Sequence, residues 1–203
     1  MRILTVSDRV VEALEDRSDP ASFPEVDLVL SCGDLPPEYL SSLARKFSAP
    51  LFYVRGNHDI RHDGYRPAGC IDADMKVVLY RGLRILGLEG SQWYNGKPHQ
   101  YTERQMRQRI RKAGAGIRRH GGIDIVITHA PPRHVHDGED QCHRGFESFH
   151  RLIERYGPRY LIHGHMHLDY SHQEQRMTVV NRTMVINTYG YYFLEIEDSQ
   201  DTK

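Results

Sequence analysis

The hydrophobic residues of this chain gather in short runs that few polar positions interrupt. Nearly continuous apolar runs of this length are typical of strands that are buried on both faces of a sheet, whereas a half-exposed strand alternates apolar and polar residues. We therefore predict one buried strand for each of the runs at residues 2–6, 26–32, 51–54, 123–128 and 160–162.

Between these runs, apolar residues recur every three or four positions, which predicts amphipathic helices. One helix is expected after Pro36-Pro37, because proline is tolerated in the first turn of a helix. A second is expected to begin at Thr102, an N-cap residue with Gln105 three positions later, and a third to end at Gly157-Pro158. The order of strand, helix and strand predicts βαβ units in the first part of the chain.

The remaining segments predict a hairpin, a loop and a meander. Residues 77–80 and 83–88 are apolar stretches joined at Arg81-Gly82, so we predict a hairpin that ends the first half of the sheet. Residues 60–76 are rich in Gly, Asp and Arg and show little periodicity, which predicts a loop. Toward the end of the chain, alternating stretches predict an antiparallel meander over residues 177–181, 183–188 and 191–196.

Length and charge narrow the class of protein. A chain of 203 residues is most simply one domain over residues 1–203, long enough to bury a sizeable core. Lys and Arg together number 27, as do Asp and Glu, so the molecule has no long-range field that favours nucleic acid or an anionic membrane. The exception is the arginine-rich segment 104–119, which we interpret as a solvated helix face, nucleic-acid binding being the alternative.

Cysteine usage and the start of the sequence favour a reducing compartment. The three cysteines, Cys32, Cys70 and Cys142, are too few and too scattered for a disulfide framework. Cys32 lies in an apolar run, so we expect it to fill the core. No charged leader precedes the first apolar run, and no run approaches the ~18–20 residues of a membrane span. We therefore expect a cytoplasmic protein without a membrane partner.

Each of the five predicted buried strands ends beside a residue that can bind a metal ion. The strands lead to Asp8, to Gly33-Asp34, to Gly56-Asn57-His58-Asp59, to His129 and to Gly164-His165-Met166-His167. A single Gly-His-x-His motif is weak evidence, since it is commonly part of an ordinary polar loop. In open α/β sheets, however, ligands bind outside the carboxyl ends of the strands, so these five ends are expected to converge on one site.

In this order the motifs resemble those of the calcineurin-like metallophosphoesterases, and the resemblance extends from residue 3 to about residue 190. It implies an α/β (α+β) fold, a four-layer αββα sandwich in which helices flank two mixed β-sheets. It also implies a metal-dependent phosphoesterase, which hydrolyses a phosphomonoester or phosphodiester with a metal-activated water at a dinuclear centre. One motif departs from the family pattern, because Val10 stands where the family has a metal-binding histidine.

The resemblance also implies a set of ligands for two divalent ions. The set comprises Asp8 and His167 for the first ion, Asn57, His129 and His165 for the second, and Asp34 as the bridge. Because Val10 offers no donor, the ion near Asp8 is expected to bind more weakly, unless a loop histidine such as His62, His143 or His172 replaces the missing ligand. Mixed carboxylate, amide and imidazole ligands suit Mn, Fe, Ni, Co or Zn.

Other side chains are candidates for contact with the substrate. By the resemblance, His58 is not a ligand and faces the substrate. We expect it to be the catalytic residue that donates a proton to the leaving oxygen or stabilises the phosphoryl charge, with Asp59 holding its ring. Arg9 and Arg144 are candidates to bind the substrate, since guanidinium matches phosphate in bidentate geometry. We expect Trp93 in the core, the alternative being that it stacks on an aromatic leaving group.

Two other functions stay open. The missing histidine at Val10 is compatible with a catalytically impaired metal-binding scaffold for a protein partner, and the segment 104–119 is compatible with a nuclease. A scaffold has no use for a proton donor beside a dinuclear site, so His58 favours an enzyme. We therefore expect a small phosphate ester as the partner and consider nucleic acid unsupported by the balanced charge.

Overall fold

The computed structural model describes residues 1–15, 23–168, 170 and 172–197, and its fold is built on two mixed β-sheets. The first sheet has the strand order β13 (Gly190–Glu195), β1 (Arg2–Ser7), β2 (Leu28–Ser31), β3 (Leu51–Tyr53) and β4 (Cys70–Asp72). β1 to β4 are parallel, and β13 is antiparallel to β1. All residues of β2 and β3 are buried, as predicted from their continuous apolar runs.

The second sheet is wider. Its strand order is β11 (Met177–Val180), β12 (Thr183–Asn187), β10 (Tyr160–His163), β9 (Ile125–Thr128), β6 (Leu83–Leu88) and β5 (Val77–Tyr80). The four central strands are parallel, and β11 and β5 are antiparallel edge strands. A separate pair of short strands is formed by β7 (Ser91–Gln92) and β8 (Gln100–Tyr101).

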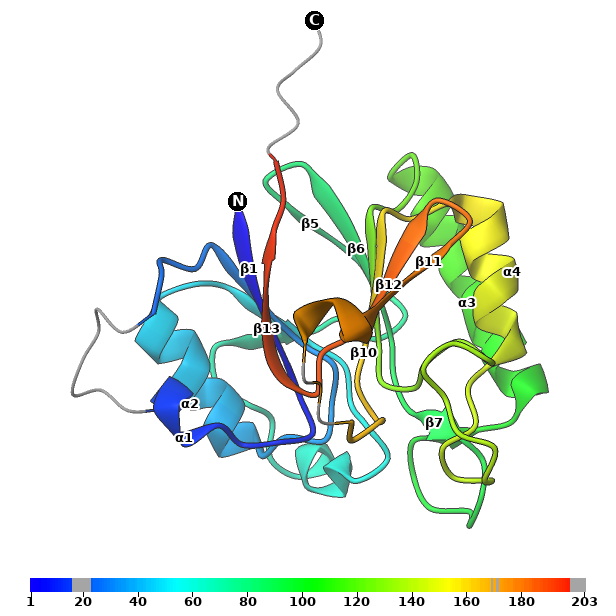
Figure 1. Ribbon diagram of the computed structural model, residues 1–203, viewed down its shortest axis with the longest axis horizontal. Helices are drawn as coiled ribbons and strands as arrows, with labels where there is room; N and C mark the ends of the chain where they lie inside the picture. The colour runs from blue at the N-terminus through cyan, green and yellow to red at the C-terminus, as the bar shows by residue number, and fades with distance from the viewer. Residues whose placement is uncertain (16–22, 169, 171, 198–203) are drawn as a thin grey trace, which may run out of the picture.

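Helices cover the outer face of each sheet (Figure 1). α1 (Glu12–Glu15) and α2 (Pro37–Phe47) pack on the first sheet, and α3 (Glu103–Arg119) and α4 (Glu147–Tyr156) pack on the second. Two 3-10 helices, η2 (Asp59–Asp63) and η3 (Gln173–Arg176), lie in connections. The layers are helix, sheet, sheet and helix, so the predicted αββα sandwich is confirmed. Within the described residues, no helix is long and apolar enough to cross a membrane.

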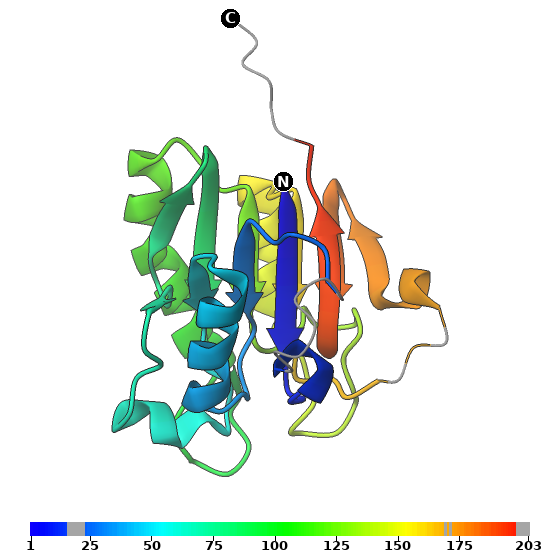
Figure 2. The same cartoon turned by 90° about the vertical axis from the view of Figure 1, so that its left-hand side faces the viewer.

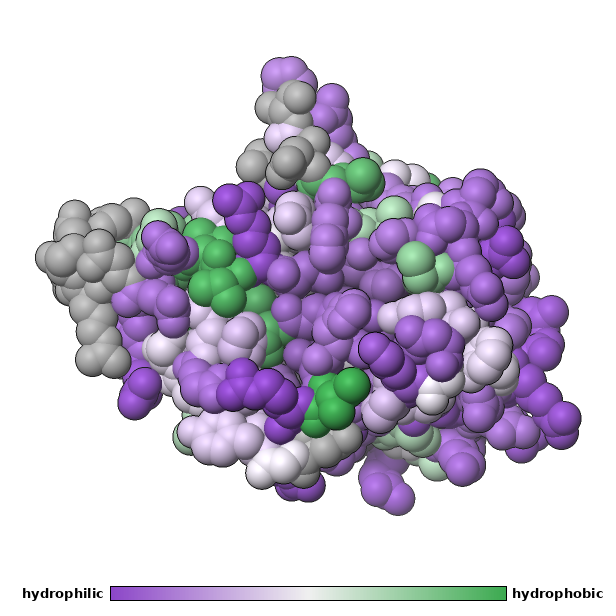
Figure 3. All heavy atoms as spheres, turned by 90° about the horizontal axis from the view of Figure 1, so that it is seen from below, coloured by the Kyte–Doolittle hydropathy of each residue, from purple (hydrophilic) through white to green (hydrophobic). Residues whose placement is uncertain are grey.

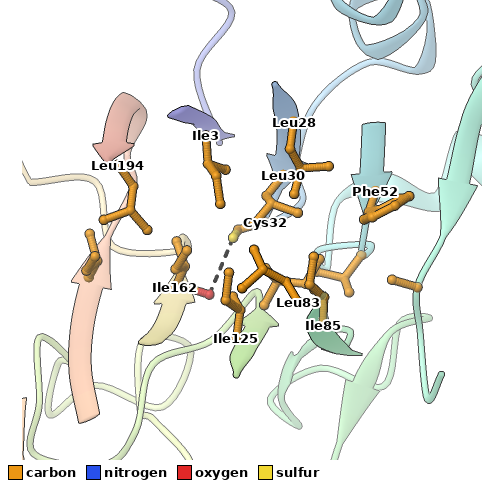
Figure 4. Packing of buried hydrophobic residues seen from close by; sticks show 14 of the residues in the cluster. Ile3, Leu28, Leu30, Cys32, Phe52, Leu83, Ile85, Ile125, Ile162 and Leu194 are labelled. Atoms are coloured by element: carbon orange, nitrogen blue, oxygen red, sulfur yellow. Dashed lines mark hydrogen bonds between the residues drawn. The ribbon is translucent and has the colours of Figure 1, made fainter. Parts of the chain in front are cut away.

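The two sheets meet through a core to which both contribute side chains (Figure 4). Ile3 and Leu30 of the first sheet lie opposite Ile125 and Ile162 of the second. Cys32 lies in the same core, where its thiol donates to the carbonyl oxygen of Ile162 at 3.4 Å, so its predicted core position is confirmed. Apolar burial of this kind stabilises the fold by roughly 25 cal/mol per Å² of surface removed from water.

The predicted helix and turn signals are confirmed in the structure. The Thr102 hydroxyl accepts from the backbone N–H of Gln105 at 3.3 Å, and the Gln105 side chain accepts from the backbone N–H of Thr102 at 2.8 Å, which forms a capping box. Gly157 ends α4 in a left-handed conformation with φ 55°, which glycine adopts at little cost. Arg81 and Gly82 both have positive φ in the β5–β6 turn.

Three predictions about strand neighbours were wrong. The meander stops at β12, because β13 crosses to the first sheet and pairs with β1, as Figure 2 shows. The β5–β6 hairpin was predicted to end the first half of a sheet that begins with β1, whereas it forms one edge of the second sheet. The predicted loop 60–76 contains η2 and β4, which extends the first sheet beside β3. Each error concerns a pairing between distant segments, which a local pattern of burial does not specify.

Trp93 does not lie in the core, contrary to the prediction. Its side chain is 49% exposed in the connection between β7 and β8, where its backbone N–H donates to the carbonyl oxygen of Tyr101 at 3.1 Å. Tryptophan is buried on average but not in every protein, and a short two-stranded sheet has no interior that could enclose its side chain.

Candidate metal centre

The loops that follow β1, β2, β3, β9 and β10 meet at one end of the sandwich. Asp8, Asp34 and His129 offer ligand atoms that all lie within 4.8 Å of one another. Asp8 and Asp34 follow strands of the first sheet and His129 follows a strand of the second, so the site lies where the carboxyl ends of both sheets meet. Figure 3 views the molecule from this end, where hydrophilic side chains dominate and hydrophobic ones form only small patches.

The candidate ligands form two groups, and His129 lies at the centre of the group expected to bind the second ion. Its Nε2 is 3.0 Å from Oδ1 of Asn57, 3.1 Å from Nδ1 of His165 and 3.4 Å from Oδ2 of Asp34. Asn57 and His165 are the two residues expected to bind the same ion as His129, and Asp34 is the expected bridging carboxylate. The structure therefore brings the members of this predicted group together.

Hydrogen bonds determine which nitrogen of each imidazole in this group carries a proton. His129 Nδ1 lies 2.8 Å from the carbonyl oxygen of Cys32, and His165 Nε2 lies 2.6 Å from the carbonyl oxygen of Cys142. A carbonyl oxygen only accepts, so both of these nitrogens are donors. The lone pairs of the neutral rings are then on His129 Nε2 and His165 Nδ1, which face each other. Partners of this kind orient metal-binding histidines in proteins.

Asn57 adds a third electron-pair donor. Its Nδ2 donates to the hydroxyl of Tyr94 at 3.0 Å, which leaves Oδ1 directed at His129. When the rings are neutral, Oδ1 of Asn57, Nε2 of His129 and Nδ1 of His165 converge without a hydrogen-bond donor between them. Such a set of lone pairs is satisfied by a shared cation. The donors therefore fit a divalent metal ion.

Asp8 and His167, the residues expected to bind the first ion, form the other group. His167 Nε2 lies 3.3 Å from Oδ1 of Asp8, and the backbone N–H of His165 donates to the other oxygen at 2.9 Å. The hydrogen bond to Asp8 raises the pKa of His167 above its ordinary value. Val10, two residues after Asp8, is 40% exposed and has no polar atom in its side chain. This group therefore has fewer donors than the group around His129.

The backbone around the candidate ligands is strained and crowded. Asp8, Asp34 and His165 have φ values of 62°, 55° and 67°, a left-handed conformation that residues other than glycine rarely adopt. A Cβ at Gly56 would collide with the side chains of Asp34 and His129, and one at Gly164 would collide with Asp8. Strain of this kind is concentrated at functional sites, where the surrounding structure compensates for it.

The charges at the site compensate one another only in part. Burial opposes ionisation of Asp34, but the charge and hydrogen bond of His129 and the backbone N–H of His58 hold the pKa of Asp34 well below its usual range. Burial also opposes charge on His129, yet the Asp34 carboxylate raises the pKa of His129 to about 10. Burial, and then the charge of His129, lower the pKa of His165 to about 4. One proton on His129 thus balances Asp34, and a divalent ion would release it.

Asp8 and Asp34 are nearly buried carboxylates whose basic partners among the described residues are histidines. Their side chains are 0% and 8% exposed, and in the described part of the chain neither forms an ion pair with lysine or arginine. A buried carboxylate is costly unless a positive charge or hydrogen bonds compensate it. Two such groups beside three imidazoles are the donor chemistry that Mn, Fe, Ni, Co or Zn takes, so the residues fit the predicted ions.

His58 and Asp59 do not interact as predicted. His58 is exposed, and its backbone N–H donates to Oδ1 of Asp34 at 2.8 Å. Asp59 does not hold the His58 ring, because its Oδ2 accepts from the backbone N–H groups of Asp34 at 2.7 Å and Gly56 at 2.8 Å, and its Oδ1 faces Nε2 of His62 at 3.5 Å. Asp59 instead joins the two loops that carry Asp34 and Asn57.

The two candidate substrate arginines lie at the surface. Arg9 is exposed directly after Asp8, and Arg144 is exposed with its Nη2 donating to the carbonyl oxygen of Glu139 at 3.3 Å. Within the described residues, neither guanidinium is hydrogen-bonded to a candidate ligand. Arg9 therefore lies next to the centre because it follows Asp8 in the sequence. No hydrogen bond among the described residues joins Arg144 to the centre.

The loop histidines do not fill the position of the missing ligand. His62 is buried with its Nε2 2.9 Å from the carbonyl oxygen of Leu35, so the suggestion that it reaches Asp8 is wrong. His143 is bound to Asp140, at 2.9 Å from Nδ1 to Oδ2, and its ring lies 5.4 Å from that of His165. His172 is exposed. None of them is hydrogen-bonded to Asp8 in the described part of the structure.

Sequence reasoning missed several residues around the site. Tyr94 orients Asn57, and the ring of Tyr189 stacks on His167 with a centroid distance of 5.0 Å and an interplanar angle of 22°. The Cys32 and Cys142 carbonyl groups orient the two central imidazoles. A backbone carbonyl carries no signal in the sequence, and the two tyrosines lie outside every motif, so no local pattern could have identified them.

An αββα sandwich with carboxylates and imidazoles at the strand ends is the arrangement that the order of the motifs implies. The chain belongs to the calcineurin-like phosphoesterase family, whose sequence model matches residues 7–169. No curated protein matches the sequence.

Solved structures support the same fold. One is 15% identical with a TM-score of 0.67 and covers 95% of this chain and 94% of that chain. The protein TT1561 of Thermus thermophilus is 17% identical with a TM-score of 0.64, covering 93% of this chain and 89% of that chain. A single mutant of Vps29 from Entamoeba histolytica is 16% identical with a TM-score of 0.49, covering 98% of this chain and 88% of that chain. At these identities the first two show the fold alone.

Proposed function

We propose that the protein is a metal-dependent phosphoesterase that hydrolyses a phosphomonoester or phosphodiester. One observation carries the proposal: His129 Nε2 lies 3.0 Å from Asn57 Oδ1 and 3.1 Å from His165 Nδ1, so three atoms that can bind a metal ion lie side by side. Hydrogen bonds that these side chains donate to Tyr94 and to two backbone carbonyl groups orient all three, as partners of this kind do in protein metal sites. Membership of the calcineurin-like phosphoesterase family supports the reaction class.

In this proposal Asn57, His129 and His165 would hold one divalent ion, Asp8 and His167 would hold the other, and Asp34 would be a ligand of both. When bound, such ions supply Lewis acidity for the phosphoryl oxygens and lower the pKa of a water molecule toward neutrality. The chain contributes the geometry: Asp59 joins the loops of Asp34 and Asn57 through two backbone N–H groups, so neither loop can shift alone.

His58 is the proposed proton donor to the leaving oxygen. It lies at the surface beside Asp34, where its backbone N–H is already engaged and its ring is accessible to a substrate. Because no carboxylate among the described residues is hydrogen-bonded to the ring, the phosphate ester itself would have to position it. General acid catalysis of this kind accelerates the departure of a poor leaving group by roughly a hundredfold or more.

A catalytically impaired scaffold is the second candidate function, and Val10 is the observation that favours it. A site with an exposed valine in place of an imidazole has three protein donors for the ion near Asp8. Catalytic metals commonly have three protein ligands and an open position, so this loss lowers affinity without abolishing chemistry. The exposed His58, which a scaffold does not need, supports the enzyme.

The proposal is tested by chelating the purified protein, adding back Mn, Ni, Co or Zn, and measuring hydrolysis of aryl phosphate monoesters and diesters. We expect turnover that depends on the added ion. Asp34→Ala should remove both ions and all hydrolysis, because its carboxylate belongs to both sites. Glu38→Ala, which removes an exposed carboxylate four residues later, is the matched control. Two ions retained by Asp34→Ala in elemental analysis would overturn the bridging assignment, and an inactive wild type with both ions bound would favour the scaffold.

A further inference from the structure

A hollow of about 870 Å³ opens beside the candidate metal centre. Three parts of the chain line it: residues 9–12 after β1, residues 168, 170 and 176 after His167, and residues 189–193 at the start of β13. Two of these parts begin next to a candidate ligand, since Arg9 follows Asp8 and Leu168 follows His167. The ring of Tyr189, which also lines the hollow, stacks on His167. The hollow therefore adjoins the side of the centre that holds Asp8 and His167.

Arg176 is the unusual side chain of this hollow. Only 7% of its surface is exposed, and its Nη1 donates to the neutral carbonyl oxygens of Asn187 and Tyr191, both at 3.3 Å. Its Nε is buried without a hydrogen-bond partner, and in the described part of the chain no carboxylate pairs with it. Burial lowers the pKa of Arg176, as expected for a cation that lacks a counter-charge. Protein guanidinium groups are rarely buried unless an anion compensates them.

The walls of the hollow are aromatic. The guanidinium carbon of Arg176 lies 4.9 Å from the ring centroid of Tyr170 and 5.6 Å from that of Tyr192. Tyr191 lines the hollow with 38% of its surface exposed. Such rings offer flat apolar surface to a ligand and lower the cost of holding a cation. The charged lining residues are Arg176, the exposed Arg9 and one acid, Glu12.

We propose that this hollow binds the leaving group of the phosphate ester, and that the leaving group carries a flat ring and an anionic group, carboxylate or phosphate, which pairs with Arg176. The inference rests on the proposed function, because it names the part of the substrate that departs. Val10 also lines the hollow, so the position at which the chain departs from the family pattern faces this leaving-group site. Arg9 at the rim would attract the same anion.

Binding can be measured without turnover. In a chelating buffer the metal centre holds no ion that could bind an anion, so the measurement reports on the hollow. The probes are 4-hydroxybenzoate, which carries a carboxylate, phenyl phosphate, which carries a phosphate, and neutral phenol, each titrated by calorimetry. We expect one or both anions to bind and phenol to bind at least tenfold more weakly, the usual effect of losing a charged hydrogen bond. Which anion binds more tightly identifies the group.

The variants are Arg176→Gln, Arg176→Lys and Arg9→Gln, with Arg151→Gln on the outer face of α4 as the matched control. Arg176→Gln should weaken binding of the preferred anion by roughly tenfold or more. Arg176→Lys should weaken it by less, because lysine keeps the positive charge but lacks the paired N–H donors of the planar guanidinium group. Arg9→Gln should cause a smaller loss. The inference is overturned if wild type binds neither anion, or if folded Arg176 variants bind as tightly as wild type. Should neither Arg176 variant fold, unchanged binding by Arg9→Gln overturns it.

Kinetics separate this inference from the proposed function. With added Mn, the KM for 3- and 4-carboxyphenyl phosphate should be lower than that for phenyl phosphate. Arg176→Gln should erase this difference in KM, and Arg176→Lys should reduce it. Hydrolysis with equal KM values and no effect of Arg176→Gln would support the phosphoesterase and overturn the leaving-group site. Anion binding that depends on Arg176 without any hydrolysis would retain the anion site and overturn the phosphoesterase.

Discussion

Val10 is the residue at which the candidate centre departs from its family, and its exposure makes the effect of restoring an imidazole testable. We predict that Val10→His tightens the ion near Asp8 and raises activity at low metal concentration, because each added donor increases affinity. The measurement is a metal titration of hydrolysis after chelation. Val11→His is the matched control, since it places the same ring one position away. Two equally tight ions in the wild type would show that another group completes this site.

His58 gives the second prediction at this scale. His58→Asn should lower turnover by about a hundredfold, the usual range for a lost general acid, while elemental analysis shows unchanged metal content. The loss should be larger for an alkyl leaving group than for 4-nitrophenolate, which departs without a proton. The exposed His134, changed to Asn in the same way, is the control. An equal loss for both leaving groups would mean that His58 acts by some route other than proton donation.

The sequence predicted which side chains meet at the site but not what holds them. All six candidate ligands follow buried strands, and parallel strands bring their carboxyl ends to one edge, so their proximity follows from the motif order. The contacts of Asp59 could not be predicted. Its carboxylate accepts from the backbone N–H groups of Asp34 and Gly56, and a backbone N–H group gives no signal in the sequence. The hydrogen-bond partners of His129 are likewise set by the tertiary structure.

At the scale of secondary-structure elements, a network of buried charged side chains joins α3, β8 and the segment after β6 to Arg55, which lies two residues before Asn57. Glu89 follows β6, and its carboxylate accepts from Arg55 Nε at 2.6 Å and from the Tyr101 hydroxyl. Arg109 of α3 donates to both oxygens of Asp74 at 2.5 and 2.6 Å, and its guanidinium carbon lies 4.2 Å from the Tyr101 ring centroid. Arg109 is thus no part of a solvated basic face, contrary to the interpretation of segment 104–119.

This network predicts acid sensitivity. Burial opposes the charge of Glu89, but hydrogen bonds from His99 and Tyr101 and the charge of Arg55 lower the pKa of Glu89 to about 2. A carboxyl with a depressed pKa stabilises the fold above its unfolded pKa, and this contribution is lost as the pH falls from about 4.5 toward 2. Glu89→Gln should therefore lower the free energy of unfolding at pH 7 by roughly 2–4 kcal/mol and flatten its pH dependence.

Urea denaturation between pH 7 and pH 3 measures both effects. The exposed Glu154 of α4, changed to Gln, is the matched control and should change stability little, since it lies outside the network. A Glu89→Gln protein whose stability falls with acid as steeply as that of the wild type would show that other carboxylates dominate.

The predicted elements were more reliable than their arrangement, and β4 and β13 explain why. β13 was predicted as a strand of a meander from its alternating pattern, but its partner β1 lies almost the whole chain away, and alternation does not specify which strand is the partner. β4 has three residues and no buried position, so it shows no apolar run. It is a strand because β3 offers an unpaired edge, which is a property of the assembled sheet.

For the whole molecule, balanced charge predicts that nucleic acid is not the main partner. The basic side chains that remain exposed on the helix layer include Arg107, Arg111, Arg151 and Arg155, which line a groove between α3 and α4. We expect only weak binding of DNA or RNA through this face, with dissociation constants of about 10⁻⁴ to 10⁻⁶ M at physiological salt. Fluorescence anisotropy of a labelled oligonucleotide at 50 and 200 mM salt is the measurement.

The double variant Arg107→Gln with Arg111→Gln should abolish whatever binding is seen, while leaving phosphate-ester hydrolysis unchanged, because α3 lies on the outer face of the second sheet. Tight, strongly salt-sensitive binding that also inhibits hydrolysis would instead support a nuclease.

The pairing of β13 with β1 affects how the chain can fold during synthesis. β1 to β4 leave the ribosome within the first 72 residues, but the strand that covers the free edge of β1 spans Gly190–Glu195. Until then, β1 presents unpaired N–H and C=O groups, which are prone to associate with other chains. We therefore expect ribosome-bound chains truncated before residue 190 to be protease-sensitive at β1, and Asp8, which directly follows this strand, to gain its final position only after residues 190–195 have been synthesised.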